Sequence, residues 1–397
     1  MKLMLAGAFP PQEKGEATYL GSYACALREL DRHSIAIVSQ YEDRPSVETW
    51  KGFTVHRCIR DRTKRPSYAQ QSELVESVQA HRPDVLHLHY GPNQDYGGRI
   101  GEPLIGALNR IRALGVKTII SLHSTWLPAD VMDSAPARRI PSALRPLAAR
   151  YFWYVTRALR RACDELFCVV AGANSPMAAQ FAAAYDITIE EELFGCDLAS
   201  EPMPALDDPL VFSFGFVRPE KGFKLLIAAF SRYVDSGGSG RLLIAGRPIN
   251  DDDRHCAGAI GSAAAAAGKR VEFRSGFLPE EELHTLLKSA SVLVLPYLRA
   301  VGPSAPMHMA LGKGRPVIAT AVGHNRAAGD AVTLVPAGSS EGIADALSLL
   351  LRNPIASAQA AERARNGARV RAWQRLAARQ SARYERLTGI MRNGHTA

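Results

Sequence analysis

Short, continuously apolar segments alternate with longer amphipathic segments along the whole chain, and this alternation limits the fold more than any other feature. Continuous apolar strands separated by helices are typical of a parallel sheet that is covered on both faces. The pattern occurs twice and predicts an α/β protein with two doubly wound, Rossmann-like domains. The expected strands of the first half are 2–8, 34–40, 53–57, 84–89, 117–123 and 165–170, and those of the second half are 210–216, 241–246, 271–276, 292–297, 316–320 and 332–335.

A Pro- and Asp-rich segment, EPMPALDDP at 201–209, separates the two halves and is the expected domain linker. We therefore expect an N-terminal domain over 1–200 and a C-terminal domain over 210–366. Two doubly wound domains that face each other place a central cleft at the carboxyl ends of their strands, where ligands bind in such sheets. Helices are expected near 17–30, 68–81, 102–114, 142–162 and 174–184, and again near 222–234, 254–268, 279–290, 305–313 and 339–352.

Composition excludes several classes of protein. Hydrophobic residues make up 47% of the 397 residues and charged residues 22%, so the chain has enough apolar surface to fold. No apolar run approaches 18 residues, and the N-terminal segment MKLMLAGAFPP is interpreted as a first buried strand instead of a signal peptide. The six cysteines lack CxxC spacing and are expected to be reduced. We therefore expect a cytoplasmic location.

The net charge of +9 is concentrated in the C-terminal tail. Residues 352–397 contain ten arginines and only two glutamates, so nucleic-acid binding by the body of the protein is not expected. An Ala/Arg-rich helix is predicted from about 356 to 392. We interpret it as a solvated helix with Trp373, Leu376, Tyr384 and Leu387 packed inward, and the alternative is contact with anionic lipid or nucleic acid.

Common catalytic signatures are missing from the sequence, which contains no GxxxxGK[ST], GxSxG or HExxH and no GxGxxG after the first strand. Asp251–Asp253 contain a DxD pattern, which we interpret as a solvated loop with an N-cap for the next helix, and not as a metal site. His87 and His89 alternate along one strand and must point to the same face. They lack a third metal ligand at a recognisable spacing and are expected to be satisfied polar groups.

The segment GFVRPEKGFKLLIAAF (215–230) predicts an anion site. A strand ends near Gly215, a loop carries Arg218 and Lys221, and a helix begins near Gly222. Two cations in front of a helix N-terminus favour a diphosphate as the ligand, because backbone N–H groups and the helix dipole add to the two full charges.

A second segment, LPYLRAVGPSAPMHMALGKGRPVIAT (295–320), predicts another anion-binding helix N-terminus. The strand 292–297 leads through Gly302 to Ser304, a suitable N-cap for a helix that begins near Ala305. Gly323 and His324 follow the next strand end. Two helix N-termini at one sheet edge support the same ligand.

Together these segments resemble the nucleotide-sugar-binding domain of GT-B-fold retaining glycosyltransferases, in particular family 4. LLIAGRP (242–248), FLPEEELHTLLKSASVLVLPY (277–297) and GKGRPVIATAVG (312–323) add to the match. The first half looks like the acceptor domain of that family in KGEATYLGSYACAL (14–27), DVLHLHYG (84–91), IISLHSTW (119–126) and LFGCD (193–197). The final helix, over 367–397 and containing Trp373, resembles the family's terminal helix that crosses back to the first domain.

The sequence departs from the family pattern at three positions. Phe216 stands where the family usually has Arg, although Arg218 follows in an RPxKG arrangement that looks like a variant of it. Val301 and Met309 replace two glutamates that the family places near the transferred sugar and the ribose. A GPSAP loop resembles members whose backbone amides bind the phosphates. His308 is a candidate for a ribose contact, and helical spacing equally allows a side chain without function.

The resemblance implies transfer of a sugar from a nucleoside-diphosphate sugar to a hydroxyl acceptor with retention of configuration, in polysaccharide or glycolipid assembly. Arg218 and Lys221 would stabilise the leaving diphosphate without a metal or resident cofactor. His123 would bind the donor sugar. Donor binding is further expected at Gly15, Gly215, Gly302, Ser304, Ala305 and His308. The alternatives are a nucleotide-sugar-binding protein without transfer activity and a nucleotide-sugar epimerase.

From 135 to 163 the chain has no acidic residue but carries seven arginines among aromatic and aliphatic side chains. Such a basic amphipathic segment is typical of contact with an anionic membrane surface and would suit a lipid-linked acceptor at the inner membrane face. The alternative is a surface helix whose aromatic side lies in the core. Both interpretations stay open.

Overall fold

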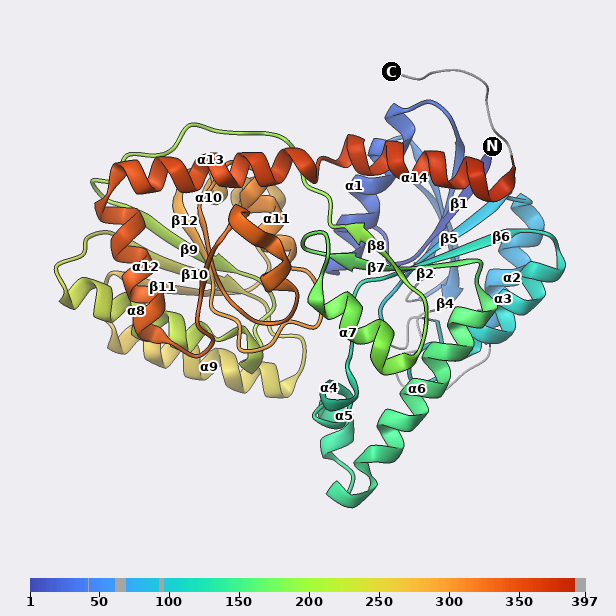
Figure 1. The fold of residues 1–397 in the computed structure, drawn as a ribbon, viewed down its shortest axis with the longest axis horizontal. Coiled ribbons are helices and arrows are strands. Elements are labelled where there is room, and N and C mark those ends of the chain that lie inside the picture. The colour runs from blue at the N-terminus through green and yellow to red at the C-terminus, as the bar shows by residue number, and fades with distance from the viewer. Residues whose placement is uncertain (42, 61–68, 93–95, 390–397) are drawn as a thin grey trace. The chain divides into compact units, whose positions relative to one another are not determined.

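The computed structural model describes residues 1–41, 43–60, 69–92 and 96–389, and the chain folds into two compact units (Figure 1). The first unit comprises Met1–Leu193 with Trp373–Ala397, and the second comprises Phe194–Ala372. The first unit thus ends before the expected boundary at 200, because the following segment bonds to the second unit. Cys196 N donates to Arg371 O, and Ala199 N donates to Gly312 O.

An eight-stranded sheet organises the first unit, in the order β3-β4-β2-β1-β5-β6-β7-β8. All neighbours are parallel except β3 and β4. The six expected strands are confirmed, and β3 and β8 were not predicted, because their polar sequences SVETW and EEEL belong to sheet edges. The strands are β1 (Lys2–Ala6), β2 (Ser34–Tyr41), β3 (Ser46–Trp50), β4 (Phe53–Arg60), β5 (Val85–Tyr90), β6 (Lys117–Leu122), β7 (Glu165–Val170) and β8 (Glu190–Leu193).

Helices cover both faces of this sheet, and β5 shows how its residues divide between them. Leu86, Leu88 and Tyr90 join the apolar core under α2, α3 and α6, whereas His87 and His89 face α1 and α14. The period-two alternation predicted for the two histidines is therefore confirmed. The helices are α1 (Gly15–Glu29), α2 (Ala69–His81), α3 (Pro103–Ala113), α4 (Pro128–Met132), α5 (Ala135–Arg138), α6 (Arg145–Ala162), α7 (Pro176–Tyr185) and α14 (Trp373–Thr388). Position 68 of the second expected helix lies outside the described residues.

A six-stranded, wholly parallel sheet in the order β11-β10-β9-β12-β13-β14 organises the second unit. Helices α8, α9 and α12 pack on one face, and α10, α11 and α13 lie on the other (Figure 1). The strands are β9 (Leu210–Phe214), β10 (Arg241–Gly246), β11 (Val271–Ser275), β12 (Ala290–Leu295), β13 (Val317–Thr320) and β14 (Thr333–Val335). The helices are α8 (Phe223–Asp235), α9 (Asp251–Ala266), α10 (Glu280–Ser289), α11 (Ala305–Gly312), α12 (Ser340–Arg352) and α13 (Pro354–Val370).

The prediction of a single tail helix over 356–392 is wrong, because this segment forms two helices, α13 and α14. The break falls at Arg371 and Ala372, where Ala372 pairs with Cys196 in an isolated parallel bridge. No Gly or Pro marks the break, so a distant strand-like contact ends the helix. Trp373, Leu376 and Tyr384 are buried as predicted, Leu387 is half-buried, and residues 390–392 lie outside the described part.

Candidate active site

The second unit carries its site loops at the point where the strand order reverses. β9 lies between β10 and β12, so the chain leaves β9 in one direction across the sheet and β12 in the other. Parallel sheets open a crevice beside their carboxyl ends at such a reversal. Both segments predicted to bind an anion therefore lie at this edge.

The loop after β9 presents the two predicted cations. Gly215 adopts φ +141°, a conformation that requires glycine, and lets the chain turn into the loop. Arg218 is 43% exposed, and its Nη1 lies 3.9 Å from Glu220 Oε1, a loose contact. Lys221 is half-buried with its Nζ 3.8 Å from the centre of the Tyr297 ring, and it forms no ion pair with any described residue. Both cations are thus available to an anion.

Backbone contacts hold this loop against the loop that follows β12. Leu298 N donates to Glu220 O at 2.8 Å. Gly222, at φ +67°, packs so closely that a Cβ there would lie 2.0 Å from Pro296 O. Neither contact was predicted, because sequence spacing does not show which loops touch.

At the start of α11 the structure corrects the role expected for Ser304. Ser304 occupies the N-cap position, but its hydroxyl makes no capping bond and lies 3.0 Å from the Tyr297 hydroxyl. Within the described chain, the N–H groups of Ala305 and Met307 have no hydrogen-bond partner, and Pro306 has no N–H. These N–H groups make the first turn of α11 a polar surface that can receive an anion.

Two further residues predicted for donor binding, Gly302 and His308, lie on or beside the same loop. Gly302 is half-buried in an ordinary backbone conformation. His308 is buried, its Nδ1 bonds Ser304 O at 2.8 Å, and its ring stacks on Phe194. This packing fits the interpretation of His308 as a structural side chain better than a ribose contact. Phe216, Val301 and Met309, at the three departures from the family pattern, are all half-buried.

A third loop closes around this edge after β13. Gly323, at φ +45°, approaches the loop after β12 so closely that a Cβ would lie 1.8 Å from Ala300 O. His324 N donates to the same carbonyl at 3.4 Å. The loops after β9, β12 and β13 are therefore one packed assembly.

In the first unit, His123 lies just after β6 and is held by other aromatic residues. Its Nε2 is 3.0 Å from His89 Nδ1, and its ring meets the edge of Tyr19 at 4.7 Å between centres. Burial lowers the pKa of His123 to about 3, so the imidazole is neutral and can serve as a hydrogen-bonding group. Gly15 begins α1, and nothing lies within 4 Å of where its Cβ would be, so space beside the backbone is open.

A buried polar network beside His123 was not predicted. Its links are the pairs Tyr23–Tyr384 at 2.5 Å, Tyr384–His87 at 2.6 Å, His87–Ser121 at 2.8 Å and Ser121–Glu192 at 2.5 Å. Burial raises the pKa of Glu192. His87 is satisfied as expected, but His89 Nε2 has no partner among the described residues. The residues come from α1, β5, β6, β8 and α14, so only the fold brings them together.

Asp251–Asp253 form the first turn of α9, not the expected loop, and the N-cap is Asn250, whose side chain accepts a bond from Asp253 N. Asp253 is buried and accepts from Ile249 N. Across the residues that the structure describes, no three His, Cys, Asp or Glu side chains are grouped to hold a metal ion. The six cysteines are free, as expected. No described helix is both long enough and apolar enough to span a membrane.

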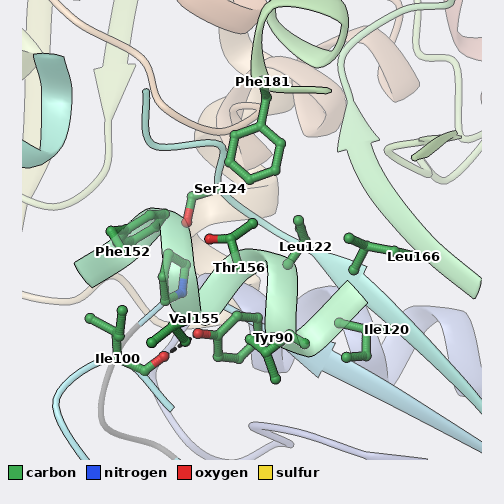
Figure 2. Close-up of a pocket in the computed structure, with 12 residues that line it drawn as sticks. Tyr90, Ile100, Ile120, Leu122, Ser124, Phe152, Val155, Thr156, Leu166 and Phe181 are labelled. Atoms are coloured by element: carbon green, nitrogen blue, oxygen red, sulfur yellow. Dashed lines mark hydrogen bonds between the residues drawn. The ribbon is translucent and has the colours of Figure 1, made fainter. Parts of the chain in front are cut away.

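Figure 2 shows a small pocket between α6 and the sheet of the first unit. Its walls are mostly apolar, with Tyr90, Ile120, Leu122 and Phe152 among them, and Ser124 and Thr156 add hydroxyl groups. A volume of about 10 Å³ suits one water molecule at most, so this pocket is a packing defect and does not bind a sugar.

Two family models match the chain, one in each unit. The model described as glycosyl transferase 4-like domain matches residues 14–189, and the model described as glycosyl transferases group 1 matches residues 208–353. Together they cover most of the sequence. The chain therefore belongs to the group 1 glycosyltransferases of GT-B fold and is an enzyme of that class.

Solved structures of the same fold match nearly the whole chain at low identity. Sucrose-phosphate synthase from Thermosynechococcus elongatus has a TM-score of 0.73 at 18% identity, with 98% of this chain and 100% of that chain covered. A UDP-forming trehalose-phosphate synthase from Burkholderia xenovorans, in complex with glucose-6-phosphate, has a TM-score of 0.69 at 14% identity, with 97% of this chain and 100% of that chain covered. Anabaena HepE, in complex with UDP and glucose, has a TM-score of 0.69 at 14% identity, with 96% of this chain and 98% of that chain covered. A search of curated protein sequences found no match.

Proposed function

We propose that this enzyme transfers a sugar, with retention of anomeric configuration, from a nucleoside-diphosphate sugar to a hydroxyl acceptor. The observation that carries the proposal is the joint placement of Lys221, Arg218 and the unpartnered N–H groups of α11 beside the reversal of the sheet. UDP and glucose bound to HepE, and glucose-6-phosphate bound to the trehalose-phosphate synthase, are ligands of the kind that this arrangement would receive.

The chemistry follows from where negative charge develops. The bond between the anomeric carbon and the diphosphate breaks, a bond to the acceptor oxygen forms, and the acceptor proton passes to a diphosphate oxygen. The diphosphate gains charge as the sugar becomes oxocarbenium-like, so groups that bind it more tightly in the transition state accelerate the reaction. Lys221, Arg218 and the helix N-terminus perform this role without a metal ion. Neutral His123 binds hydroxyl groups of the donor sugar.

Replacing Lys221 by Ala tests the proposal most directly. A thermal-shift screen of UDP, GDP, ADP and their sugars first identifies the donor, since a ligand that binds the folded state raises its stability. With that donor, Lys221→Ala should lower kcat/KM about a hundredfold or more, as expected when a transition-state contact is removed. NMR of the product reports the anomeric configuration, and EDTA should leave the rate unchanged.

The matched control is Lys224→Ala, which removes an exposed lysine three positions further along, on α8. Its activity should equal that of the wild-type enzyme. Wild-type turnover in a folded Lys221→Ala variant would overturn the assigned site. Binding of a nucleotide-sugar without transfer to any acceptor would favour the non-transferring alternative instead.

We further propose that the acceptor is lipid-linked and that the first unit contacts an anionic membrane through the start of α6. Leu147 and Tyr154 on this helix are 61% and 64% exposed, while Phe152, Val155 and Leu159 on its other side are buried. Arg139 and Arg150 form no ion pair with any described residue, whereas Arg138 and Arg157 are paired with aspartates. Exposed apolar side chains beside unpaired arginines match the surface of an anionic bilayer.

Vesicle sedimentation tests this membrane contact. The enzyme should sediment with anionic vesicles at low salt, be released at about 0.5 M salt, and bind weakly to neutral vesicles, because screening shortens the electrostatic attraction. Leu147→Asp with Tyr154→Asp should abolish sedimentation. The same substitution at the exposed residues Leu349 and Ile355 of the second unit should not. Equal binding to neutral and anionic vesicles would refute the electrostatic part of the proposal.

A further inference from the structure

The Tyr297 side chain contacts both anion-binding elements of the second unit. It follows β12 and is almost completely buried, at 1% exposed. Thr320 Oγ1 donates to its carbonyl at 2.6 Å, which fixes the backbone at the strand end. From this anchored position its ring lies under Lys221, and its hydroxyl meets Ser304.

The hydroxyl contact has a specific consequence for α11. Ser is a preferred N-cap residue because its oxygen accepts a bond from the N–H of the second or third helical residue. Here the third helical residue is Met307, yet Ser304 Oγ bonds Tyr297 at 3.0 Å and makes no capping bond. The helix therefore loses its natural cap, and the N–H groups of Ala305 and Met307 stay without a partner in the described chain.

The ring contact acts on the other element. Lys221 Nζ lies 3.8 Å from the ring centre, where the negative face of an aromatic ring attracts a cation. Lys221 has no carboxylate partner among the described residues that would compete with a ligand or hold the ammonium elsewhere. The ring thus restricts a flexible lysine without neutralising its charge, which lowers the entropy that ligand binding must remove.

We infer that Tyr297 is a positioning residue that prepares the site for a diphosphate by diverting Ser304 from its capping role and by supporting Lys221. This inference rests on the proposed function and assigns no contact between Tyr297 and the ligand. It implies that loss of the hydroxyl weakens binding without lowering the stability of the fold. Without its partner, Ser304 is free to cap Met307 N–H, which stabilises α11 and removes one of the two N–H groups offered to the anion.

Inorganic pyrophosphate is the probe, because it requires neither the donor base nor the sugar to be known. Calorimetry should show about three- to tenfold weaker binding for Tyr297→Phe, with a melting temperature equal to or above that of the wild type. Adding Ser304→Ala to Tyr297→Phe should strengthen binding again, since the competing cap is removed. Tyr297→Leu, which also removes the ring under Lys221, should bind more than tenfold more weakly, and Ser304→Ala should not rescue it.

Tyr233→Phe is the matched control, since it removes the hydroxyl of another fully buried tyrosine of this unit, on α8. It should leave pyrophosphate binding unchanged. Wild-type affinity in Tyr297→Phe, or a double variant that binds no better than Tyr297→Phe, would overturn the inference even while Lys221→Ala remains impaired. Wild-type affinity in Lys221→Ala would instead overturn the diphosphate site itself, so the two failures are distinguishable.

Discussion

Single glycines decide how closely the site loops of the second unit approach each other. Gly222 and Gly237 both have positive φ, at +67° and +89°, but only Gly222 faces a backbone carbonyl within 4 Å. A side chain at either position is strained, because L-residues disfavour this region by roughly 1–2 kcal/mol. At Gly222 a Cβ would additionally collide with Pro296 O.

We predict that Gly237→Ala lowers the free energy of unfolding by about 1 kcal/mol and that Gly222→Ala lowers it by at least about twice as much. Gly222→Ala should also weaken pyrophosphate binding, because the loop with Lys221 must move away from the loop with Tyr297. Urea unfolding and calorimetry measure the two effects. Equal losses of stability in the two variants would mean that the loops do not pack as the structure shows.

At the scale of elements, α14 makes both polar and aromatic contacts with the rest of the first unit. Tyr384 bonds both Tyr23 and His87, and Trp373 packs against Tyr19 at 4.9 Å between ring centres. A buried polar group that loses its partner costs about 1–3 kcal/mol, more than the net gain from forming the bond. The Tyr384 hydroxyl therefore matters mainly because His87 and Tyr23 cannot reach water without it.

Tyr384→Phe should lower the free energy of unfolding of the first unit by about 1–3 kcal/mol, as measured by urea unfolding. Tyr154→Phe, which removes a hydroxyl from a tyrosine that is 64% exposed, is the control and should change stability little. Equal stability of Tyr384→Phe and the wild type would show that the network contributes nothing to holding α14.

For the whole molecule, buried histidines should make stability depend on pH. Burial lowers the pKa of His87 and His123 to about 3 and that of His324 to about 4, and it lowers the pKa of His89 well below 6.5. All four side chains are neutral in the folded chain at neutral pH. Below about pH 6.5, the ordinary pKa of histidine, they take up protons when the chain unfolds. Their contribution to the free energy of unfolding is therefore fully present above about pH 6.5 and is lost as the pH falls towards 3. Glu192, whose pKa is raised, acts in the opposite direction.

Each buried histidine should contribute a slope of up to about 1.4 kcal/mol per pH unit below its unfolded pKa. Unfolding curves between pH 7 and 5 should show this decline. His87→Gln should reduce the number of protons taken up on unfolding by about one, which lowers the slope by up to about 1.4 kcal/mol per pH unit. His255→Gln, at an exposed position on α9, should leave the slope unchanged. A slope that His87→Gln does not alter would contradict a neutral, buried His87.

Sequence alone determined the α/β class, the two parallel sheets and the loops that carry Lys221, Arg218 and Ser304. Continuous apolar segments and helical periodicity are local properties of the sequence. Twelve of the strands could therefore be predicted from them. Polar edge strands such as β3 and β8 were not, because they bury little apolar surface.

Only the tertiary structure decided which side chains meet. Sequence spacing predicts that Ser304 caps α11, but its hydroxyl bonds Tyr297 instead. The contact between Lys221 and the Tyr297 ring, and the hydrogen bonds from Tyr384 to Glu192, join segments that are distant in sequence. The break between α13 and α14 likewise follows from the pairing of Ala372 with Cys196. Local pattern specifies an element because its residues are covalent neighbours, whereas a site depends on directions and distances that exist only after those elements pack.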